Sequence, residues 1–296
     1  MMKFFEKRPM AMIVLGVVGI SLSSIFVKFS TAPAAVTAAW RLLWTVVLMS
    51  PVVLSSSSTR QAFTKVSKKD WLLSTLSGLA LALHFILWFE SLKHTSVSSS
   101  TTLVCTEVVW VSLGWCIFMG GKLRPKAIAA IGAALLGSVL VALADTSAGQ
   151  AHLYGDLLSL ASALAVAVYM LLGRAVQKRL STGVYTYIVY FACLAGLLAV
   201  CGGYGFDLFA HGWVTPAVGL ALAVFSTILG HSVFSWCLRH FSPAFVSASK
   251  LCEPVVAALL ALPLFGEYPG WLQVVGGAVI LGGVWYYAHL ENKEAA

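Results

Sequence analysis

Two stretches of the sequence, LKHTSVSSSTTLVCTE at residues 92–107 and LRHFSPAFVSASKLCE at residues 238–253, decide how the whole chain is organised. Both begin with Leu, a basic residue and His, and both end at a glutamate, Glu107 or Glu253, with no gap between aligned positions. Their offset of 146 residues is about half of the 296-residue chain. Further on, GAALLG at residues 132–137 aligns with GAVILG at residues 277–282, at an offset of 145. Self-similarity of this kind indicates an internal duplication.

The composition places both copies in a membrane. Charged residues make up 10% of the chain, against about 25% in soluble proteins, and hydrophobic residues make up 59%, with a mean hydropathy of +0.90. So few charges cannot cover a soluble globule, and so many apolar residues exclude a disordered or collagen-like chain. Continuous apolar runs, rather than alternating segments, argue against a β-barrel. Runs of about 20 apolar residues predict ten spanning helices, at roughly residues 10–30, 34–54, 71–92, 98–119, 126–144, 155–174, 183–202, 214–238, 244–265 and 270–289.

The basic residues orient these predicted spans. Fifteen of the 19 Lys and Arg residues fall on one side of the predicted membrane, three fall within spans, and Lys93 alone falls on the other side. Loops rich in Lys and Arg stay in the cytoplasm. We therefore expect a multi-pass protein of the cell inner membrane with both termini in the cytoplasm. Loops that face anionic lipid also explain the net charge of +8, so no nucleic-acid partner is predicted.

Each copy holds five predicted spans, and an odd number turns the second copy upside down in the bilayer. We expect an all-α integral membrane protein with ten transmembrane helices as two inverted five-helix repeats, at residues 1–145 and 155–290. Inverted repeats with a site near the membrane midplane are a transporter architecture. The small-xxx-small patterns that end at Gly137 and Gly282 predict close packing of the fifth and tenth helices.

Several motifs are similar to those of a known transporter family. GHSVFSWCLRHFSPAFVS at residues 230–247, EPV at residues 253–255 and LFGE at residues 264–267 resemble the EamA-domain family of the drug/metabolite transporter superfamily. AAWRLL at residues 38–43 is similar to the Arg-containing second helix of that family. The first half departs from the pattern, because Val108 follows Glu107 where Pro is usual, and Gly121-Lys122 stands where Gly-Glu is usual. The resemblance covers essentially the whole chain as two tandem EamA domains. It implies small-molecule export through a central cavity between the halves.

The paired glutamates are the first candidate site residues. Each lies about nine residues into its predicted helix, which is about 13–14 Å deep and close to the middle of a ~30 Å hydrocarbon core. A carboxylate at that depth costs at least ~2.5–3.5 kcal/mol, so Glu107 and Glu253 should face the bundle interior and be paired or protonated. Lys250 lies one turn before Glu253 and is expected to pair with it. Glu107 has no basic neighbour within a turn, so we expect it to carry a coupling proton, a structural hydrogen bond being the alternative.

Five further residues are candidates for substrate binding or coupling: Arg41, His84, His231, Trp88 and Trp110. Arg41 lies about a third of the way into its helix, where its guanidinium either binds a substrate carboxylate or locks helices by capping carbonyls. The two histidines lie on the third and eighth predicted helices, where they either carry protons or form hydrogen bonds across helices. Trp88, one turn from His84, and Trp110, three residues after Glu107, are expected to line a cavity.

The expected function is a secondary transporter that exports small metabolites, such as amino acids or related amphipathic compounds, by alternating access, with or without proton coupling. The sequence contains no P-loop, GxSxG or HExxH motif, so neither ATP drive nor an enzyme is predicted. All six cysteines lie in apolar runs without a CxxC pattern, so no metal site and no cofactor is predicted. The expected partners are a small-molecule substrate and the lipid bilayer, with the oligomeric state left open.

Three alternatives stay open at this stage. The first is import or exchange of an anionic metabolite, such as a nucleotide derivative, in which Lys28, Arg41 and Lys250 form the anion site. The second is an intramembrane enzyme. The third is a passive channel, which needs no exchange between two states.

Overall fold

The computed structural model describes residues 9–95, 97–144, 153–256, 259–260 and 270–295, and every regular element in these ranges is helical. Eight helices of this described part are long and apolar enough to cross a membrane. They are Pro9–Lys28 (α2), Ala34–Ser55 (α3), Lys68–His94 (α5), Ser99–Met119, Leu153–Val176 (α9), Thr182–Tyr204 (α10), Val214–Cys237 and Trp271–Glu291 within α15 (Trp271–Ala295).

Two of the ten predicted spans are not among these eight helices. The predicted span at 126–144 corresponds to α8 (Pro125–Ala144), whose apolar part, Pro125–Val141, is shorter than the others. The predicted span at 244–265 begins as α13 (Pro243–Ser249) and continues through a 3₁₀ turn, η2 (Lys250–Cys252), into helical residues 253–256. Most of its second half, together with the LFGE motif, lies outside the described residues. The chain is thus an all-helical integral membrane protein with eight described spans, and the count of ten stays a prediction.

Three of the spans are interrupted where the sequence predicts continuous helices. The fourth divides into α6 (Val97–Val104) and α7 (Glu107–Met119), with a turn at residues 105–106 between them. The eighth consists of α11 (Val214–Ala221), a π-helix, η1 (Leu222–His231), and α12 (Ser232–Cys237). The ninth contains η2. Irregular backbone is tolerated at membrane depth where protein or a cavity surrounds it, so the interruptions mark the interior of the bundle.

Helix ends at one pole of the molecule are defined by serine caps. The Ser67 hydroxyl accepts the Asp70 backbone N–H at the start of α5, and the Ser181 hydroxyl accepts the Val184 N–H at the start of α10. Arg179 Nε also donates to Asp70 Oδ1 over 2.9 Å, which joins α5 to the segment before α10. This hydrogen bond to the carboxylate raises the pKa of Arg179. The short helix α4 (Ser57–Thr64) lies at the same pole.

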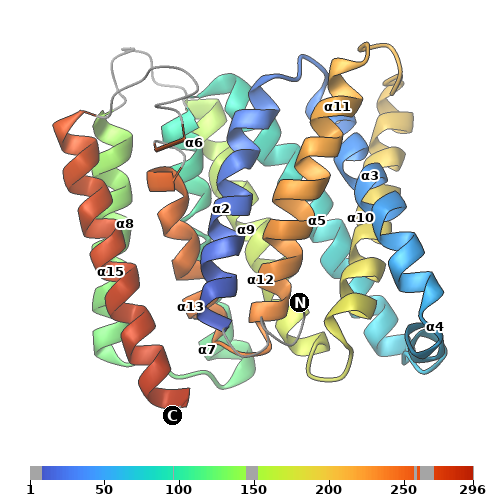
Figure 1. The fold of residues 1–296 in the computed structure, drawn as a ribbon. Helices are drawn as coiled ribbons and strands as arrows, with labels where there is room; N and C mark the ends of the chain where they lie inside the picture. The colour runs from blue at the N-terminus through green and yellow to red at the C-terminus, as the bar shows by residue number, and fades with distance from the viewer. Residues whose placement is uncertain (1–8, 96, 145–152, 257–258, 261–269, 296) are drawn as a thin grey trace.

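The spanning helices form a bundle in which neighbours in space are often distant in sequence (Figure 1). α5 packs on α9 and α10 in the middle, and α2 packs on η1. α3 packs on α10 and α11, while α8 and α15 form a close pair at one edge of the bundle. The core therefore mixes helices from the first and second halves of the chain, which brings residues about 146 positions apart to one centre.

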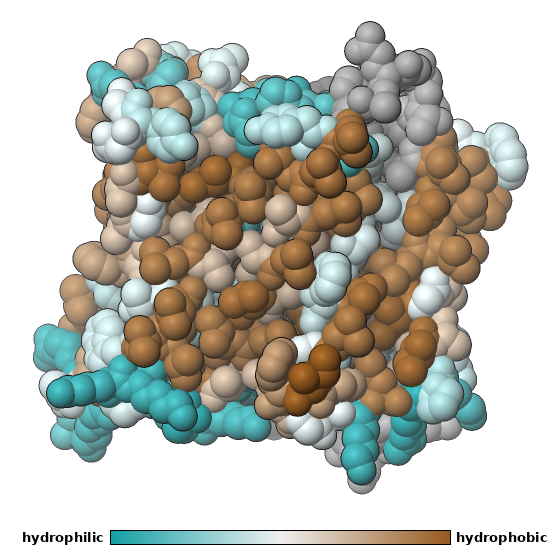
Figure 2. Space-filling model, turned by 180° about the vertical axis from the view of Figure 1, so that it is seen from behind, coloured by the Kyte–Doolittle hydropathy of each residue, from teal (hydrophilic) through white to brown (hydrophobic). Residues whose placement is uncertain are grey.

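The surface matches this arrangement of helices. Figure 2 shows a broad apolar band between two hydrophilic rims. Apolar side chains that are more than half exposed on the spanning helices and on α8 include Val52, Leu72, Ile117, Leu136 and Val274. The start of α2, helix α4, the loop before α10 and the end of α15 lie at the same pole. Helix α4 carries Arg60, and the turns at this pole carry Lys65, Lys178, Arg179 and Arg239. This pole is called the basic pole below.

Glycines allow α8 and α15 to approach closely. A side chain at Gly137 would meet the Gly276 carbonyl oxygen at 2.7 Å, and one at Gly283 would meet the Ala130 carbonyl oxygen at 2.9 Å. The predicted contact at Gly282 is wrong, because a side chain there would meet nothing within 4 Å. The two close contacts are related by 146 residues, since Gly137 corresponds to Gly283 and Ala130 to Gly276. This is the offset of the glutamates rather than the 145 of the GAALLG alignment.

We predict that Gly137→Leu destabilises the fold whereas Gly132→Leu does not. Both positions lie in α8, but a side chain at Gly132 meets nothing within 4 Å. Overpacking at Gly137 should cost about 1–3 kcal/mol, which thermal unfolding of the purified protein in detergent measures against the Gly132→Leu control. Equal melting temperatures for the two variants would contradict close packing of α8 on α15.

Candidate functional site

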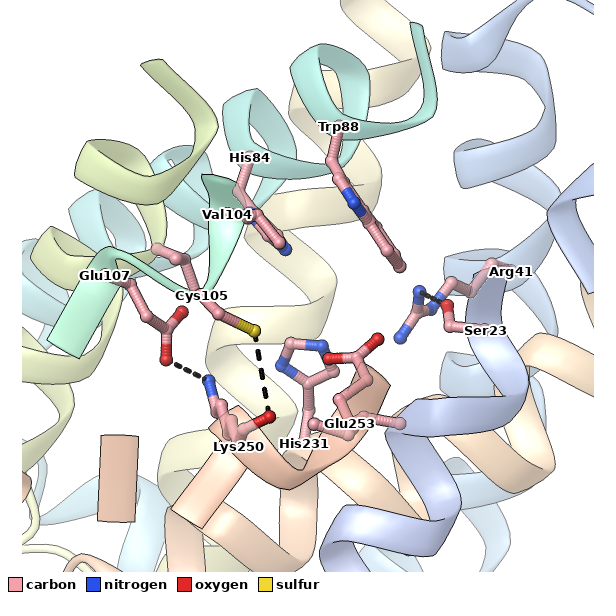
Figure 3. Close-up of a pocket in the computed structure, with 12 residues that line it drawn as sticks. Ser23, Arg41, His84, Trp88, Val104, Cys105, Glu107, His231, Lys250 and Glu253 are labelled. Carbon is pink, nitrogen blue, oxygen red and sulfur yellow. Dashed lines mark hydrogen bonds and ion pairs between the residues drawn. The ribbon is translucent and has the colours of Figure 1, made fainter. Parts of the chain in front are cut away.

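The candidate site is a small cavity at the centre of the bundle, where helices of both halves meet (Figure 3). Its volume of about 30 Å³ has room for about two water molecules, so a metabolite does not fit in this conformation. Its walls combine charged, aromatic and aliphatic side chains: Ile20, Ser23, Arg41, His84, Trp88, Val104, Cys105, Glu107, Val166, His231, Lys250 and Glu253. Seven of the eight sequence-predicted site residues are among them.

An ion pair between Glu107 and Lys250 crosses from the first half of the chain to the second. Lys250 Nζ lies 2.8 Å from Glu107 Oε1, and both side chains are less than a tenth exposed. The same carboxylate oxygen accepts the Ser247 hydroxyl over 3.0 Å, and Lys250 Nζ lies 3.4 Å from the Met170 sulfur. Glu107 is the first residue of α7, just after the interruption, so its carboxylate also lies at the positive end of a half-helix.

The predicted pairing of Lys250 with Glu253 is therefore wrong. Side chains in a helix lean toward its N-terminus, so Lys250 leans away from Glu253, which follows it in the chain. The Glu107 carboxylate, on the neighbouring α7, lies within reach of the lysine instead. The correction also removes the reason for assigning a proton to Glu107, which was that it lacks a basic partner. Residue spacing predicts contacts within one helix and cannot predict a partner on a neighbouring helix.

Glu253 directly follows the 3₁₀ turn η2, and the proline after it explains why the backbone forms this turn. Pro254 has no N–H to donate to the Lys250 carbonyl four residues earlier. That carbonyl accepts the Glu253 N–H in a tighter turn, and the Cys105 thiol lies 3.7 Å from it. Glu253 is 6% exposed, and its Oε1 has no hydrogen-bond partner among the described residues. The Lys250 carbonyl, which Pro254 leaves without its usual helical donor, is thus occupied, whereas Glu253 Oε1 is not.

Arg41 is completely buried and joins three helices. Its Nε donates to Thr227 Oγ1 over 2.7 Å and its Nη1 donates to Ser23 Oγ over 3.3 Å, while Cζ lies 4.1 Å from the centre of the Phe85 ring. These contacts tie α3 to η1, α2 and α5. The third nitrogen, Nη2, has no partner in the described part of the chain. Two nitrogens of Arg41 therefore join helices, through hydroxyl groups rather than the expected carbonyls, while substrate binding by Arg41 stays a prediction.

The π-helix η1 positions two of these contacts. In η1 the backbone bonds run from residue i to i−5, as in the bond from the Ser232 N–H to the Thr227 carbonyl. The wider turn presents Thr227 to Arg41 and His231 to the cavity. Single-turn π-helices often occur at functional sites, and this one spans ten residues, Leu222–His231.

Two histidines and a tryptophan line the cavity together. The His84 ring stacks on Trp88 with centroids 6.0 Å apart and an interplanar angle of 10°, and it lies edge-on to His231 at 6.2 Å. The Ser162 hydroxyl lies 2.7 Å from His84 Nδ1, so the ring is held from α9. Trp88 Nε1 is buried and has no partner among the described residues.

Two residues named from the sequence lie elsewhere. Trp110 is 41% exposed on the surface of α7, so the expectation that it lines the cavity is wrong. On α7 the buried face runs through Glu107, Val108 and Val111, and Trp110 lies beside it, toward the surface. Lys28 is exposed at the end of α2 and takes no part in the cavity, as expected for a side chain that reaches the headgroups. Sequence reasoning missed Ser23 and Cys105, because a serine and a cysteine in apolar runs give no signal of their own.

Apolar helices long enough to span a bilayer, enclosing a charged cavity between the halves of the chain, define a multi-pass membrane protein. The chain belongs to the EamA-like transporter family, which matches residues 7–143 and again residues 153–288. A protein of Archaeoglobus fulgidus named an uncharacterized transporter is 24% identical over 246 residues, covering 80% of this chain and 83% of that protein. An uncharacterized transporter of Bacillus subtilis is 25% identical over 229 residues, or 74% of this chain and 70% of that protein.

The fold is also found among solved structures. One crystal structure aligns with a TM-score of 0.76 over 98% of this chain and 99% of its own, at 18% identity. At that identity the likeness concerns the fold alone. Family and relatives together identify the chain as a membrane transporter.

The ion pair predicts a specific pattern of stability. Glu107→Gln or Lys250→Met alone leaves an uncompensated buried charge, which should cost about 3–5 kcal/mol. The double variant Glu107→Gln/Lys250→Met removes both charges and should regain most of that loss, as thermal unfolding in detergent reports. Glu90→Gln is the matched control, because the pair of Glu90 with Lys93 is about a third exposed and contributes about 0–1 kcal/mol. A double variant as unstable as the sum of the singles would contradict a direct pairing.

Proposed function

We propose that the protein is a secondary transporter that exports small metabolites across the cell inner membrane by alternating access. The observation that carries the proposal is the central cavity, which lies where one interrupted helix from each half of the chain meets the other. Transporters built from repeats bind substrate near the membrane midplane, between discontinuous helices.

The two interruptions correspond to one another. The turn at residues 105–106 precedes Glu107, and the 3₁₀ turn Lys250–Cys252 precedes Glu253. Adding 146 to the first turn gives residues 251–252, which lie within the second. The same backbone break at corresponding places supports two repeats with related folds, each of which carries a glutamate just after the break.

Helix packing supports an inverted arrangement of ten helices, with repeats at residues 1–145 and 155–290. Exchange of the halves turns the packing of α2 on η1 into the packing of α9 on α5, and both contacts occur. It leaves the α8 pair with α15 and the α3 pair with α10 unchanged, and both of these occur too. The glycine contacts at Gly137 and Gly283 follow the same relation. A two-fold relation between halves of five helices accounts for all of these observations.

A second cavity supports entry from the cytoplasm. It has a volume of about 510 Å³ and is lined near the basic pole by Met12, Met49, Thr186, Ser232 and Trp236, among others. Ser232 follows His231, which lines the central cavity, and its hydroxyl is hydrogen-bonded to the Tyr190 hydroxyl over 2.9 Å. Positively charged loops face the cytoplasm. A mostly apolar groove near that side, which includes the exposed Val52 and comes within one residue of the central cavity, suits an amphipathic solute that leaves the cell.

The closed central cavity means that the two halves must move apart to admit a metabolite. Because no P-loop is present in the sequence, the energy comes from an ion or solute gradient, and we propose protons. Glu107 is ion-paired, so of the two glutamates Glu253 is the candidate for carrying the proton.

The orientation is tested by a cysteine at Ser57, which is exposed in α4 at the basic pole. In intact cells Ser57→Cys should resist a membrane-impermeant thiol reagent and should react after permeabilisation. A cysteine at Phe209, which is 75% exposed at the opposite pole, should react in both conditions. The parent protein gives the background of its natural cysteines. Labelling of Ser57→Cys from outside would place the basic pole outside the cell.

Transport is tested by counterflow in proteoliposomes. Vesicles loaded with unlabelled L-amino acids should take up a labelled one above its equilibrium level, because a carrier exchanges solutes one for one. A passive channel would show uptake that does not depend on the internal solute. A labelled nucleoside diphosphate tests the rival anionic substrate, and counterflow of that solute alone would overturn the proposed substrate. An imposed proton gradient should drive net accumulation, whereas accumulation independent of pH would remove proton coupling.

A further inference from the structure

The second cavity, of about 510 Å³, is a groove on the side of the bundle. Its lining residues belong to α2, α3, α10, η1 and α12, and four of these helices, α2, α3, α10 and α12, begin or end at the basic pole (Figure 1). Leu48 and Val52, which line it on α3, are 39% and 74% exposed on a spanning helix. The groove therefore opens sideways, where lipid surrounds the protein, and it is called the lateral groove below.

The lateral groove extends through most of one leaflet of the bilayer. Its lining begins near the basic pole, at Gly183 on α10 and Trp236 on α12, and continues along α12 and η1 to Ile228. At a helical rise of about 1.5 Å per residue, Trp236 and Ile228 are about 10–12 Å apart along the axis. Half of a ~30 Å hydrocarbon core is about 15 Å. A groove of this depth, open along its side, has the shape of an extended alkyl chain.

The hydroxyl groups of the lateral groove are already hydrogen-bonded to the protein. The Thr182 hydroxyl donates to Gln177 Oε1 over 2.9 Å, and the Thr186 hydroxyl donates to the Thr182 carbonyl over 2.9 Å. The Ser232 hydroxyl is hydrogen-bonded to the Tyr190 hydroxyl, also over 2.9 Å. Most of the remaining wall consists of Met, Leu, Ile and Val side chains. The groove thus presents mainly carbon atoms to its occupant, which favours a hydrocarbon chain over a polar solute.

Two arginines lie at the rim of the lateral groove, at the basic pole. Arg60 Nη1 donates to the Leu54 carbonyl over 3.1 Å, which places the guanidinium beside the residue that follows Val53 of the groove wall. The backbone N–H of Arg239 donates to the carbonyl of Trp236, another wall residue, over 3.1 Å. Both arginines are exposed, and neither forms an ion pair with a described residue. Their charges are therefore available to an anion at the membrane surface.

We propose that the lateral groove binds one acyl chain of an anionic glycerophospholipid from the leaflet at the basic pole, with the lipid phosphate between Arg60 and Arg239. A guanidinium offers a planar pair of donors that matches two phosphate oxygens. Inside a membrane a chain gains little hydrophobic free energy from burial, because the surrounding lipid tails are equally apolar. The fit of the chain to the groove and the charge of the headgroup therefore decide which lipid is bound.

This lipid site adjoins the central cavity. Ser232 of the groove wall directly follows His231 of the cavity wall, and both lie on the continuous helix formed by η1 and α12. The chain fills the groove in the conformation whose central cavity is too small for a metabolite, and a solute that takes this path displaces the chain. The inference goes beyond the proposed function, because lipid binding does not depend on which solute is transported.

The experiment measures lipid binding to the purified full-length protein, delipidated in a non-ionic detergent at low salt. Native mass spectrometry counts the lipids retained as dioleoyl-phosphatidylglycerol or dioleoyl-phosphatidylcholine is titrated in. We expect the first phosphatidylglycerol to bind about 25-fold more tightly than phosphatidylcholine, which has the same chains but no net charge, because each arginine contributes about five-fold. Phosphatidylglycerol should also raise the melting temperature of the parent protein, since it binds the folded state.

A glycine in the wall provides a variant that fills the lateral groove. A side chain at Gly183 would meet nothing within 4 Å, so Gly183→Trp should fold normally while its indole takes the space of the chain. We expect this variant to bind phosphatidylglycerol at least about 10-fold more weakly and to lose the lipid-dependent rise in melting temperature. Gly202→Trp is the matched control, because it lies near the other end of α10 and a side chain there also meets nothing within 4 Å. Equal melting temperatures without lipid show that both variants are folded.

Charge variants test the headgroup contact. Arg60→Gln/Arg239→Gln should lower the affinity for phosphatidylglycerol about 25-fold, to that of phosphatidylcholine, and should leave phosphatidylcholine binding unchanged. Lys122→Gln/Lys126→Gln removes the same number of charges at the same pole, beside α8, which does not line the lateral groove. This control should bind both lipids as the parent does.

The outcomes separate the lipid site from the proposed function. Equal affinity for the two lipids, or phosphatidylglycerol binding by Gly183→Trp that matches the parent, would overturn the lipid site. Weaker binding by the groove and arginine variants, with both controls unchanged, would support it. The measurement involves no transport, so loss of the lipid site leaves the transporter proposal standing, and absence of counterflow leaves the lipid site standing.

Discussion

The hydrogen-bonded ion pair between Lys250 and Glu107 is the contact on which the centre of the molecule depends. No water is available in the hydrocarbon core, so a charged side chain there must meet an opposite charge or bear a cost of several kcal/mol. The pair links α13 and η2 to α7, and Ser247 adds a second donor to the same carboxylate oxygen. Glu107 follows the turn in its helix, and Lys250 is the first residue of η2. Both charges therefore lie at the interruptions, in the centre of the bundle.

Arg41 is the second centre of charge, and it is compensated in a different way. Hydroxyl groups of Ser23 and Thr227 and the face of Phe85 surround the guanidinium, and no described carboxylate forms an ion pair with it. Neutral acceptors hold a cation in place but leave its charge available. The same residue therefore joins α2, α3 and η1 and still lines the cavity, with Nη2 left without a partner among the described residues. Two nitrogens can be engaged while the third is not, because a guanidinium has five N–H donors.

The sequence predicts most of the spans and the burial of the charged candidate residues, because both depend on local composition. Apolar runs of about 20 residues identify spans, and seven of the eight candidate residues line one cavity. Contacts between helices are not local, and there the predictions were wrong for Lys250 and Trp110. Helix interruptions lie beside Lys250 and beside Glu107, and the sequence predicted continuous helices at both places. Only the interruption at Lys250 has a proline nearby, Pro254, and the turn before Glu107 occurs without one.

Similar backbones with unequal side chains explain why one of the two glutamates has no ion-pair partner among the described residues. Glu107 and Glu253 occupy corresponding positions, but Val104 stands where the other half has Lys250. One lysine therefore serves two glutamates, and its lean toward the N-terminus of its own helix selects the one on the opposite half. The other carboxylate is left in the cavity that Arg41 also faces. A lysine in each half would give each glutamate its own partner, whereas the single lysine pairs with Glu107 and leaves Glu253 Oε1 without a partner among the described residues.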